Sequence, residues 1–256
     1  MNEQTHIIIP SCDAYSDAWS PFFQLLFRYW PGCPYPIHLV STNETYEDPR
    51  VHNISLTEDL GWASNLRRVI EDLGCKSIVY MQEDYFLQSP MNTTRLESVI
   101  QYGRQIGAGY IRLAGAPNPD LPHDNPFGLG EISRGADYRC SLQAAWWNAE
   151  TLLKLLVDGE TGWDMELRGS GRSSAMSEPF LATYVGSPLI DYYADTGILK
   201  GKWLPGALRF CRREGIDVDT SRRGTHAELP LLMKRLRKSP PITAARSLFK
   251  RRRPAA

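Results

Sequence analysis

Two adjacent carboxylates follow an apolar run and stand out for their chemistry. Residues 77–81 form an uninterrupted run of the kind found in a buried parallel strand, and Glu83 and Asp84 come at its carboxyl end. Neighbouring carboxylates repel unless a cation or solvent relieves them. Mg²⁺ and Mn²⁺ prefer such oxygens and commonly share them with substrate phosphates. Glu83 and Asp84 are therefore candidate metal ligands, and an acidic turn facing water is the alternative.

A second acidic pair, Asp164 and Glu166, lies in the segment GWDME. In an extended segment these two side chains would share a face. Partial desolvation beside Trp163 would raise the pKa of a carboxylate and make it a better general base. The alternative is the first turn of a helix, where acidic residues are common. The residues alone do not choose between Asp164 and Glu166 as the base.

Several familiar catalytic motifs are missing. A dinucleotide-binding GxGxxG would have to follow the first strand, but the chain reads PSCDAY there. There is no Walker loop, and the GSGRS at 169–173 follows no obvious strand, as a serine-hydrolase elbow would require. These absences leave the acidic residues as the main chemical signal.

The expected elements alternate between strands and helices. Apolar runs predict strands at 6–10, 37–41, 77–81 and 109–114, and helical spacing predicts helices near 16–30, 62–73 and 94–106. We expect N-caps at Ser16 and Asn148 and a capping box from Thr94 to Glu97. The proline- and glycine-rich stretch 115–135 predicts an irregular loop, followed by a strand at 138–147. The alternation predicts an α/β fold with a mostly parallel sheet.

The length of 256 residues suits one large core, and we expect a single domain over 1–228 with a basic tail over 229–256. Five cysteines show no paired spacing, which favours reduced thiols over a disulfide framework. No apolar run is long enough to span a bilayer, and the start MNEQTHIIIP does not read as a signal peptide. We therefore expect a cytoplasmic protein.

The tail concentrates positive charge. Nine of the 29 basic residues follow Glu228, where no acidic residue occurs, so the rest of the chain has 20 basic against 29 acidic residues. With apolar residues interleaved, such a tail predicts peripheral contact with an anionic membrane at its inner face. A solvated chain end is an equally consistent interpretation, and we expect no nucleic-acid partner.

Residues 6–215 resemble nucleotide-sugar-dependent glycosyltransferases of the GT-A fold, particularly those that build bacterial polysaccharide and lipopolysaccharide. The resemblance rests on IVYMQEDYFL at 78–87, YRCSLQAAWWNAETLLKLL at 138–156, GETGWDMELRGSGRS after it and ILKGKWLP at 198–205. It implies a Rossmann-like three-layer α/β fold. The acidic sequence departs from the family's DxD pattern, because Tyr85 follows Glu83-Asp84.

The resemblance also implies functions for particular residues. Glu83 and Asp84 would hold a divalent cation, Mn²⁺ or Mg²⁺, that bridges the donor's phosphates. Donor-binding residues would be Ser11, Asp13, Tyr15, Lys200, Lys202 and Trp203. Asp164 or Glu166 would deprotonate the acceptor. Aromatic faces suit sugar rings, which makes Trp146, Trp147, Trp163 and Trp203 candidates for lining a sugar site.

The expected function is an inverting, hexosyltransferase-like transfer of a sugar from a nucleotide diphosphate sugar to a surface glycan or a lipid-linked acceptor. A sugar-phosphate nucleotidylyltransferase is one alternative, but it would carry a glycine-rich basic loop where this chain has PSCDAYSD. A noncatalytic glycan-binding module, in which the acidic residues are structural, is another. Binding of Mn²⁺ and nucleotide diphosphates separates the last alternative from the others.

Overall fold

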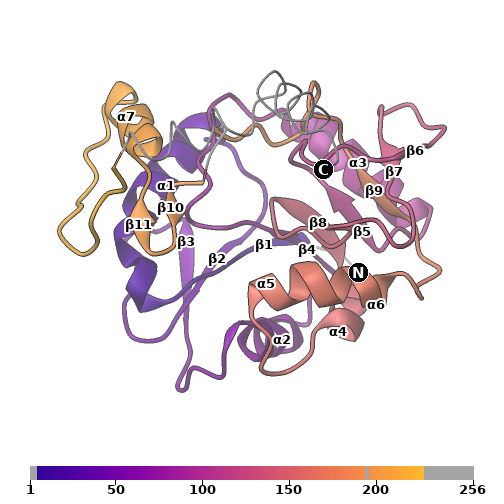
Figure 1. The fold of residues 1–256 in the computed structure, drawn as a ribbon, viewed down its shortest axis with the longest axis horizontal. Coiled ribbons are helices and arrows are strands. Elements are labelled where there is room, and N and C mark those ends of the chain that lie inside the picture. The colour runs from indigo at the N-terminus through magenta and orange to yellow at the C-terminus, as the bar shows by residue number, and fades with distance from the viewer. Residues whose placement is uncertain (1–4, 194–195, 228–256) are drawn as a thin grey trace, which may run out of the picture. The chain divides into compact units, whose positions relative to one another are not determined.

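The structure is a computed structural model that describes residues 5–193 and 196–227. It divides into two compact units between Thr196 and Gly197 (Figure 1). The expected tail 229–256 lies outside the described residues, and the expected single domain 1–228 stays a prediction. None of the helices in the described ranges has the length and apolar character needed to cross a membrane.

A nine-stranded sheet forms the centre of the first unit, in the order β3-β2-β1-β4-β8-β5-β9-β7-β6. The strands in chain order are β1 (Thr5–Pro10), β2 (Ile37–Ser41), β3 (Val51–Ser55), β4 (Ser77–Tyr80), β5 (Tyr110–Arg112), β6 (Leu121–Pro122), β7 (Gly130–Glu131), β8 (Ala145–Asn148) and β9 (Phe180–Ala182). Only β7 and β8 run against the direction of the others. The expected α/β fold with a mostly parallel sheet is confirmed.

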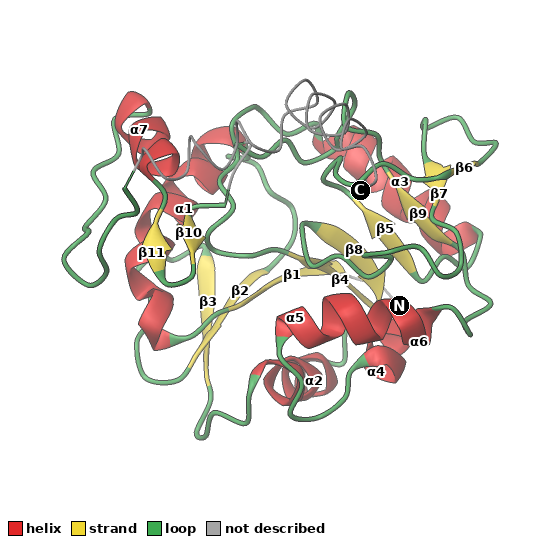
Figure 2. Cartoon of the chain, viewed as in Figure 1, coloured by secondary structure: helices red, strands yellow, loops and turns green. Residues whose placement is uncertain are grey.

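Helices cover both faces of this sheet and give the three layers that we expected (Figure 2). The helices are α1 (Ser16–Tyr29), α2 (Trp62–Leu73), α3 (Thr93–Gln105), α4 (Ala149–Leu155), α5 (Gly162–Asp164) and α6 (Ser170–Ser173), with a 3₁₀ turn η1 (Asp13–Tyr15) and a π turn η2 (Met165–Gly169). On one face, α2 and α4 pack with Ile8, Tyr80 and Trp147 in a buried cluster. On the other face, Gly103 of α3 lies against Ile111 and Trp146.

Local sequence explains where β4, α2 and α4 form and end. All four residues of β4 are buried, as the uninterrupted run predicts. Helix α2 ends at Gly74, which takes the left-handed conformation (φ 57°) that glycine tolerates at a helix C-terminus. Asn148 caps α4 by accepting a hydrogen bond from the Thr151 amide, as predicted.

Two predicted caps are wrong. Helix α3 begins at Thr93, because the side chain of Asn92 accepts a hydrogen bond from the Arg95 amide, so Thr94 lies inside the helix. Helix α1 includes Ser16 itself, and no side chain caps its N-terminus.

The region between α3 and α4 also differs from the prediction. The stretch 115–135 contains the short paired strands β6 and β7. The strand predicted over 138–147 is limited to β8, because Tyr138 takes a positive φ of 54° that ends extended pairing. Arg139 is buried, and its side chain donates hydrogen bonds to the Ile132 and Ser173 carbonyls. These side-chain hydrogen bonds, and not backbone pairing with another strand, hold this segment in place.

The segment that carries Asp164 and Glu166 is helical, so the extended arrangement is wrong and the first-turn alternative is correct for Asp164. Thr161 precedes α5 and forms a capping box with Asp164. Because helical residues two apart point to different sides, the two carboxylates do not share a face. The π turn η2 then contains Glu166, and such turns are often found at functional sites.

The second unit contains a hairpin and a helix within residues 197–227. Strands β10 (Ile198–Leu199) and β11 (Lys202–Trp203) pair antiparallel, and α7 (Pro205–Arg213) follows. Lys200 and Gly201 form the two-residue turn, and both have positive φ, 49° and 72°. This conformation suits the twist of a tight hairpin.

Candidate active site

The carboxyl ends of β1 and β4 meet where the strand order reverses. Strand β1 pairs with β2 on one side and with β4 on the other, both parallel. In open α/β sheets, ligands bind beyond the carboxyl ends of the strands at such a reversal. The segments that leave this edge are the loop from Ser11 and the turn with Glu83 and Asp84. The topology therefore brings the first two groups of predicted site residues to one end of the sheet.

The loop after β1 is braced by its own side chains. Ser11 Oγ accepts a hydrogen bond from Trp19 Nε1 at 2.8 Å, and Tyr15 lies at the end of η1. The Asp13 carboxylate accepts hydrogen bonds from the amides of residues 42–44 and from the Asn43 side chain. Partial burial opposes ionisation, but these hydrogen bonds outweigh it and lower the pKa of Asp13 to about 2. Asp13 thus joins this loop to the one after β2.

Glu83 and Asp84 form a tight turn after β4. The Glu83 side chain is 7% exposed, while Asp84 is half-buried and accepts a hydrogen bond from Thr196 Oγ1. Burial raises the pKa of the Cys12 thiol, and the negative charge of Glu83 raises it further. Because β4 pairs with β1, the turn of Glu83 and Asp84 leaves the sheet beside the loop after β1.

The chemistry of these donors decides which kind of cation site they fit. Within residues 5–193 and 196–227, no group of three His, Cys, Asp or Glu side chains could hold a metal ion. Glu83 and Asp84 supply carboxylates only, from one turn. Mg²⁺ is commonly held by one or two carboxylates together with substrate phosphates. The residues therefore fit a cation completed by a phosphate ligand and do not form a site made of protein alone.

Glu166 reaches the same edge of the sheet because β8 is antiparallel. Ala145, the first residue of β8, pairs with Tyr80, the last residue of β4. Just before β8, the Leu142 amide donates to Glu166 Oε1 at 2.8 Å and Ser141 Oγ donates to the same oxygen at 3.3 Å. The carboxylate of Glu166 is thus held beside the strand start that adjoins the end of β4.

Contacts of Tyr80 also link the two acidic groups. Its hydroxyl accepts a hydrogen bond from Trp62 Nε1 at 3.2 Å. Trp62 in turn lies next to Gly162, at the start of the helical segment that bears Glu166. Burial raises the pKa of Tyr80. The negative charges of Glu83 and Glu166 raise the pKa of this phenol further.

Asp164 and Glu166 differ in environment. Asp164 Oδ2 accepts hydrogen bonds from the Thr161 hydroxyl and amide, which lower the pKa of Asp164, and Arg168 lies 3.5 Å from Oδ1. Burial raises the pKa of Glu166 above its ordinary value, although its bonds to Leu142 and Ser141 oppose this. Asp164 belongs to a helix capping box, whereas Glu166 is the carboxylate of the two whose pKa is raised.

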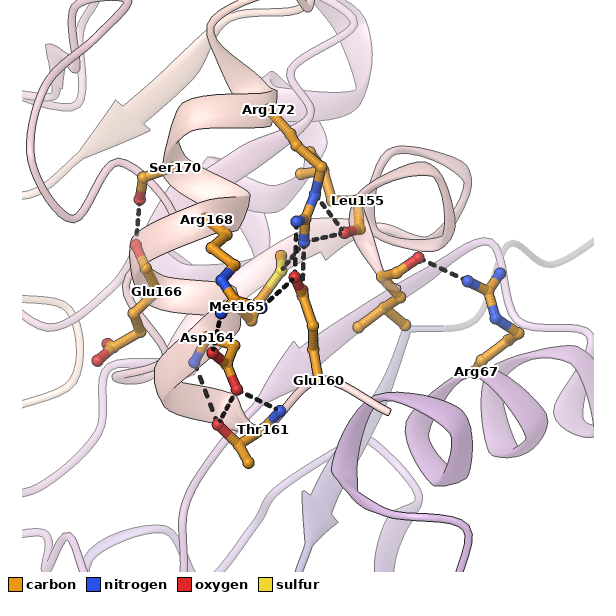
Figure 3. Close-up of polar contacts among 11 residues, drawn as sticks. Arg67, Leu155, Glu160, Thr161, Asp164, Met165, Glu166, Arg168, Ser170 and Arg172 are labelled. Atoms are coloured by element: carbon orange, nitrogen blue, oxygen red, sulfur yellow. Dashed lines mark hydrogen bonds and ion pairs between the residues drawn. The ribbon is translucent and has the colours of Figure 1, made fainter. Parts of the chain in front are cut away.

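An ion pair between half-buried Arg172 and buried Glu160 holds the helical segment from the opposite side. Arg172 donates to both oxygens of Glu160, at 2.9 and 2.6 Å, and to the Leu155 carbonyl. Figure 3 shows this pair, with the Glu166 carboxylate pointing away from it. The ion pair therefore fixes the segment without engaging Glu166.

Sequence reasoning missed Tyr80, Trp62, Glu160 and Arg172. The position of Tyr80 as the final strand residue before the acidic turn could have identified it. The Glu160–Arg172 contact spans 12 residues, and no sequence periodicity marks it.

The tryptophans expected to line a sugar site are mostly in the core. Trp146, Trp147 and Trp203 are fully buried, and core packing accounts for their positions. Trp163 is 69% exposed and stays a candidate.

The predicted donor-binding residues of the second unit lie on its hairpin. Lys200 and Lys202 are exposed at and beside the turn, and Trp203 is buried. A donor-binding function for these three residues stays a prediction.

Comparisons with known proteins found similarity in structure only. No protein-family model and no curated protein sequence matches the chain. Residues 1–349 of S. aureus TarS share 10% identity (TM-score 0.46), with 76% of this chain and 60% of that chain covered. The Pyrobaculum calidifontis mannosyltransferase PcManGT, in complex with GDP-Man and Mn²⁺, shares 12% (TM-score 0.49, 77% and 58% covered).

A cytidylyltransferase from Leptospira borgpetersenii also shares 12% identity, with a TM-score of 0.41 and 64% of this chain and 68% of that chain covered. The chain thus spans about 60% of the length of the TarS fragment and of the mannosyltransferase. All three TM-scores are below 0.5, so these likenesses concern parts of the fold and say nothing of the activity of this chain.

Proposed function

We propose that this chain is an inverting glycosyltransferase that uses a nucleotide diphosphate sugar. One observation carries the proposal: antiparallel β8 brings Glu166 to the edge of the sheet where β4 delivers Glu83 and Asp84. A group suited to hold a phosphate-bound cation and a group suited to accept a proton then lie at the same end of the sheet. An inverting, cation-assisted transfer from a nucleotide diphosphate sugar would use both groups.

On the donor side, Glu83 and Asp84 would hold a divalent cation together with the donor's phosphates. When bound, the cation neutralises charge on the departing diphosphate. The loop from Ser11 to Tyr15 would contact the nucleoside, at the carboxyl end of β1. Because Asp13 already accepts hydrogen bonds from residues 42–44, we assign it to shaping this loop.

On the acceptor side, Glu166 would remove the proton from the attacking hydroxyl. The acceptor oxygen forms a bond to the anomeric carbon as the bond from that carbon to the phosphate oxygen breaks. The electron pair of the broken bond leaves with the diphosphate, and the proton goes to Glu166. A single displacement inverts the anomeric centre. The raised pKa of Glu166 supports its choice over Asp164, whose oxygens cap a helix.

Surface glycan or a lipid-linked saccharide is the acceptor that we propose. Exposed Trp163 and Leu167, on the helical segment that carries Glu166, support a saccharide acceptor, because apolar side chains suit the C–H faces of sugar rings.

The test is sugar transfer and donor hydrolysis with UDP-, GDP- and dTDP-sugars in the presence of Mn²⁺ or Mg²⁺. Glu166→Gln should lower kcat by a factor of about 10² or more while donor affinity is kept. Asp164→Asn is the matched control, and it should keep most of kcat but unfold at lower temperature, since its cap is weakened. Asp84→Asn should lose cation-dependent donor binding. Full activity in Glu166→Gln would sink the assigned base.

The same preparation distinguishes the alternatives. Release of pyrophosphate from a nucleoside triphosphate and a sugar phosphate would identify a nucleotidylyltransferase instead. Failure to bind either Mn²⁺ or any nucleotide diphosphate in calorimetry would favour a noncatalytic glycan-binding module.

A further inference from the structure

Tyr192 carries a buried hydroxyl that has no hydrogen-bond partner in the described part of the chain. Its backbone forms an antiparallel bridge with Leu87, and the next amide, of Tyr193, donates to the Phe86 carbonyl at 2.8 Å. These backbone contacts place Tyr192 beside the residues that follow the acidic turn.

Side-chain contacts bring Tyr192 closer to that turn. The rings of Tyr85 and Tyr192 lie 5.5 Å apart between centroids. Thr196, four residues beyond Tyr192, donates a hydrogen bond to Asp84. Burial raises the pKa of Tyr192, and the charges of Tyr85, Asp84 and Tyr80 raise it further. The phenol therefore stays protonated near neutral pH and can donate a hydrogen bond.

An unpaired buried hydroxyl is unusual and needs an explanation, because desolvation without a partner destabilises the free protein. Two other buried phenols are paired: the Tyr80 hydroxyl accepts from Trp62, and the Tyr110 hydroxyl donates to the Ser141 carbonyl at 2.8 Å. A ligand oxygen that completes the hydrogen bonding of Tyr192 in the bound state would account for the difference.

We propose that the Tyr192 hydroxyl donates a hydrogen bond to the transferred sugar of the donor. This inference rests on the proposed glycosyltransferase function. If the diphosphate is held at Glu83 and Asp84, the sugar must extend from there toward Glu166. Tyr192 is joined to the acidic turn by its ring contact with Tyr85 and its bridge to Leu87. Tyr80, the last residue of β4 before that turn, pairs with Ala145, close to the segment that holds Glu166. An oxygen of the sugar is therefore the partner that this position fits.

The experiment compares Tyr192→Phe with the unchanged protein. Calorimetry with Mn²⁺ measures the affinity for UDP-glucose, UDP-N-acetylglucosamine and GDP-mannose, and for UDP and GDP alone. For the nucleotide sugar that the unchanged protein binds, Tyr192→Phe should weaken binding about tenfold, the effect of one hydrogen bond. Affinity for the nucleotide diphosphate should change less than twofold, because it lacks the sugar.

Thermal unfolding tests whether the Tyr192 hydroxyl is needed for stability instead of for binding. Tyr192→Phe should unfold at the same or a higher temperature than the unchanged protein, because it removes an unpaired buried group. Tyr110→Phe, which loses a hydrogen bond to Ser141, is the matched control and should unfold at a lower temperature. Three results for Tyr192→Phe would overturn the assignment of Tyr192. They are an equal loss of affinity for nucleotide diphosphate and nucleotide sugar, no loss of affinity for either, and unfolding at a temperature as low as that of Tyr110→Phe. If the unchanged protein binds no nucleotide sugar, the proposed function fails as well.

Discussion

Replacing Arg172 by Met should destabilise the protein more than any exposed charge substitution. The Arg172 guanidinium donates two hydrogen bonds to Glu160, whose side chain is 8% exposed, and two more to the Leu155 carbonyl. Breaking a buried ion pair by removing one partner costs about 3–5 kcal/mol, because the other charge stays buried. The Arg172 side chain is 30% exposed, so solvent weakens the pair, and Arg168 lies 3.8 Å from Glu160 and partly replaces the lost cation. We therefore expect a loss near the lower end, about 3 kcal/mol.

Urea unfolding followed by circular dichroism measures this loss. Lys154→Met is the control, because its ion pair with Glu150 is exposed and should contribute little. The double variant Glu160→Gln with Arg172→Met should recover part of the loss, since the stranded carboxylate is gone. If the losses of the two single variants simply add, the reasoning from a buried pair is refuted.

Three further predictions concern pH and local hydrogen bonds. Burial and the neighbouring His6 lower the pKa of His38 to about 4, so below pH 6.5 the unfolded chain binds a proton that the folded protein does not. The free energy of unfolding should thus fall by at most about 3 kcal/mol as the pH is lowered from 6.5 to 4. A His38→Gln variant whose free energy of unfolding depends on pH as that of the unchanged protein does would contradict this. Asp13→Ala should cost about 1 kcal/mol in urea unfolding, because the loop after β2 loses its acceptor, and no change would show that solvent replaces it. Ser141→Ala should raise the pKa of Glu166 and move the acidic limb of the kcat/KM profile to higher pH, whereas an unmoved limb would separate Glu166 from the proton transfer.

The central strands were predictable because burial on both faces leaves a local signature. The runs at 6–10, 37–41 and 77–81 contain few polar residues, and they became β1, β2 and β4. The same reasoning located the acidic turn at the carboxyl end of β4. No long-range information was needed for these elements.

Features that depend on distant contacts were not predictable. The strand predicted over 138–147 is limited to β8, because Tyr138 takes a positive φ and Arg139 donates to carbonyls at residues 132 and 173. The distinction between Asp164 and Glu166 depends on the Thr161 cap and on amides just before β8. Tyr192 approaches the acidic turn through a bridge to a residue more than 100 positions earlier in the chain. Each of these follows from tertiary structure that overrides the local pattern.

The direction of a single strand determines whether the candidate site exists at all. If β8 ran parallel to β4, its preceding residues would lie at the opposite edge of the sheet. Four residues of strand span about 13 Å, so Glu166, held by the Leu142 amide, would be separated from the acidic turn by at least that distance. Pairing Ala145 with Tyr80 removes this separation. The proposal that Glu166 accepts a proton while the turn of Glu83 and Asp84 holds a phosphate-bound cation therefore depends on the antiparallel direction of β8.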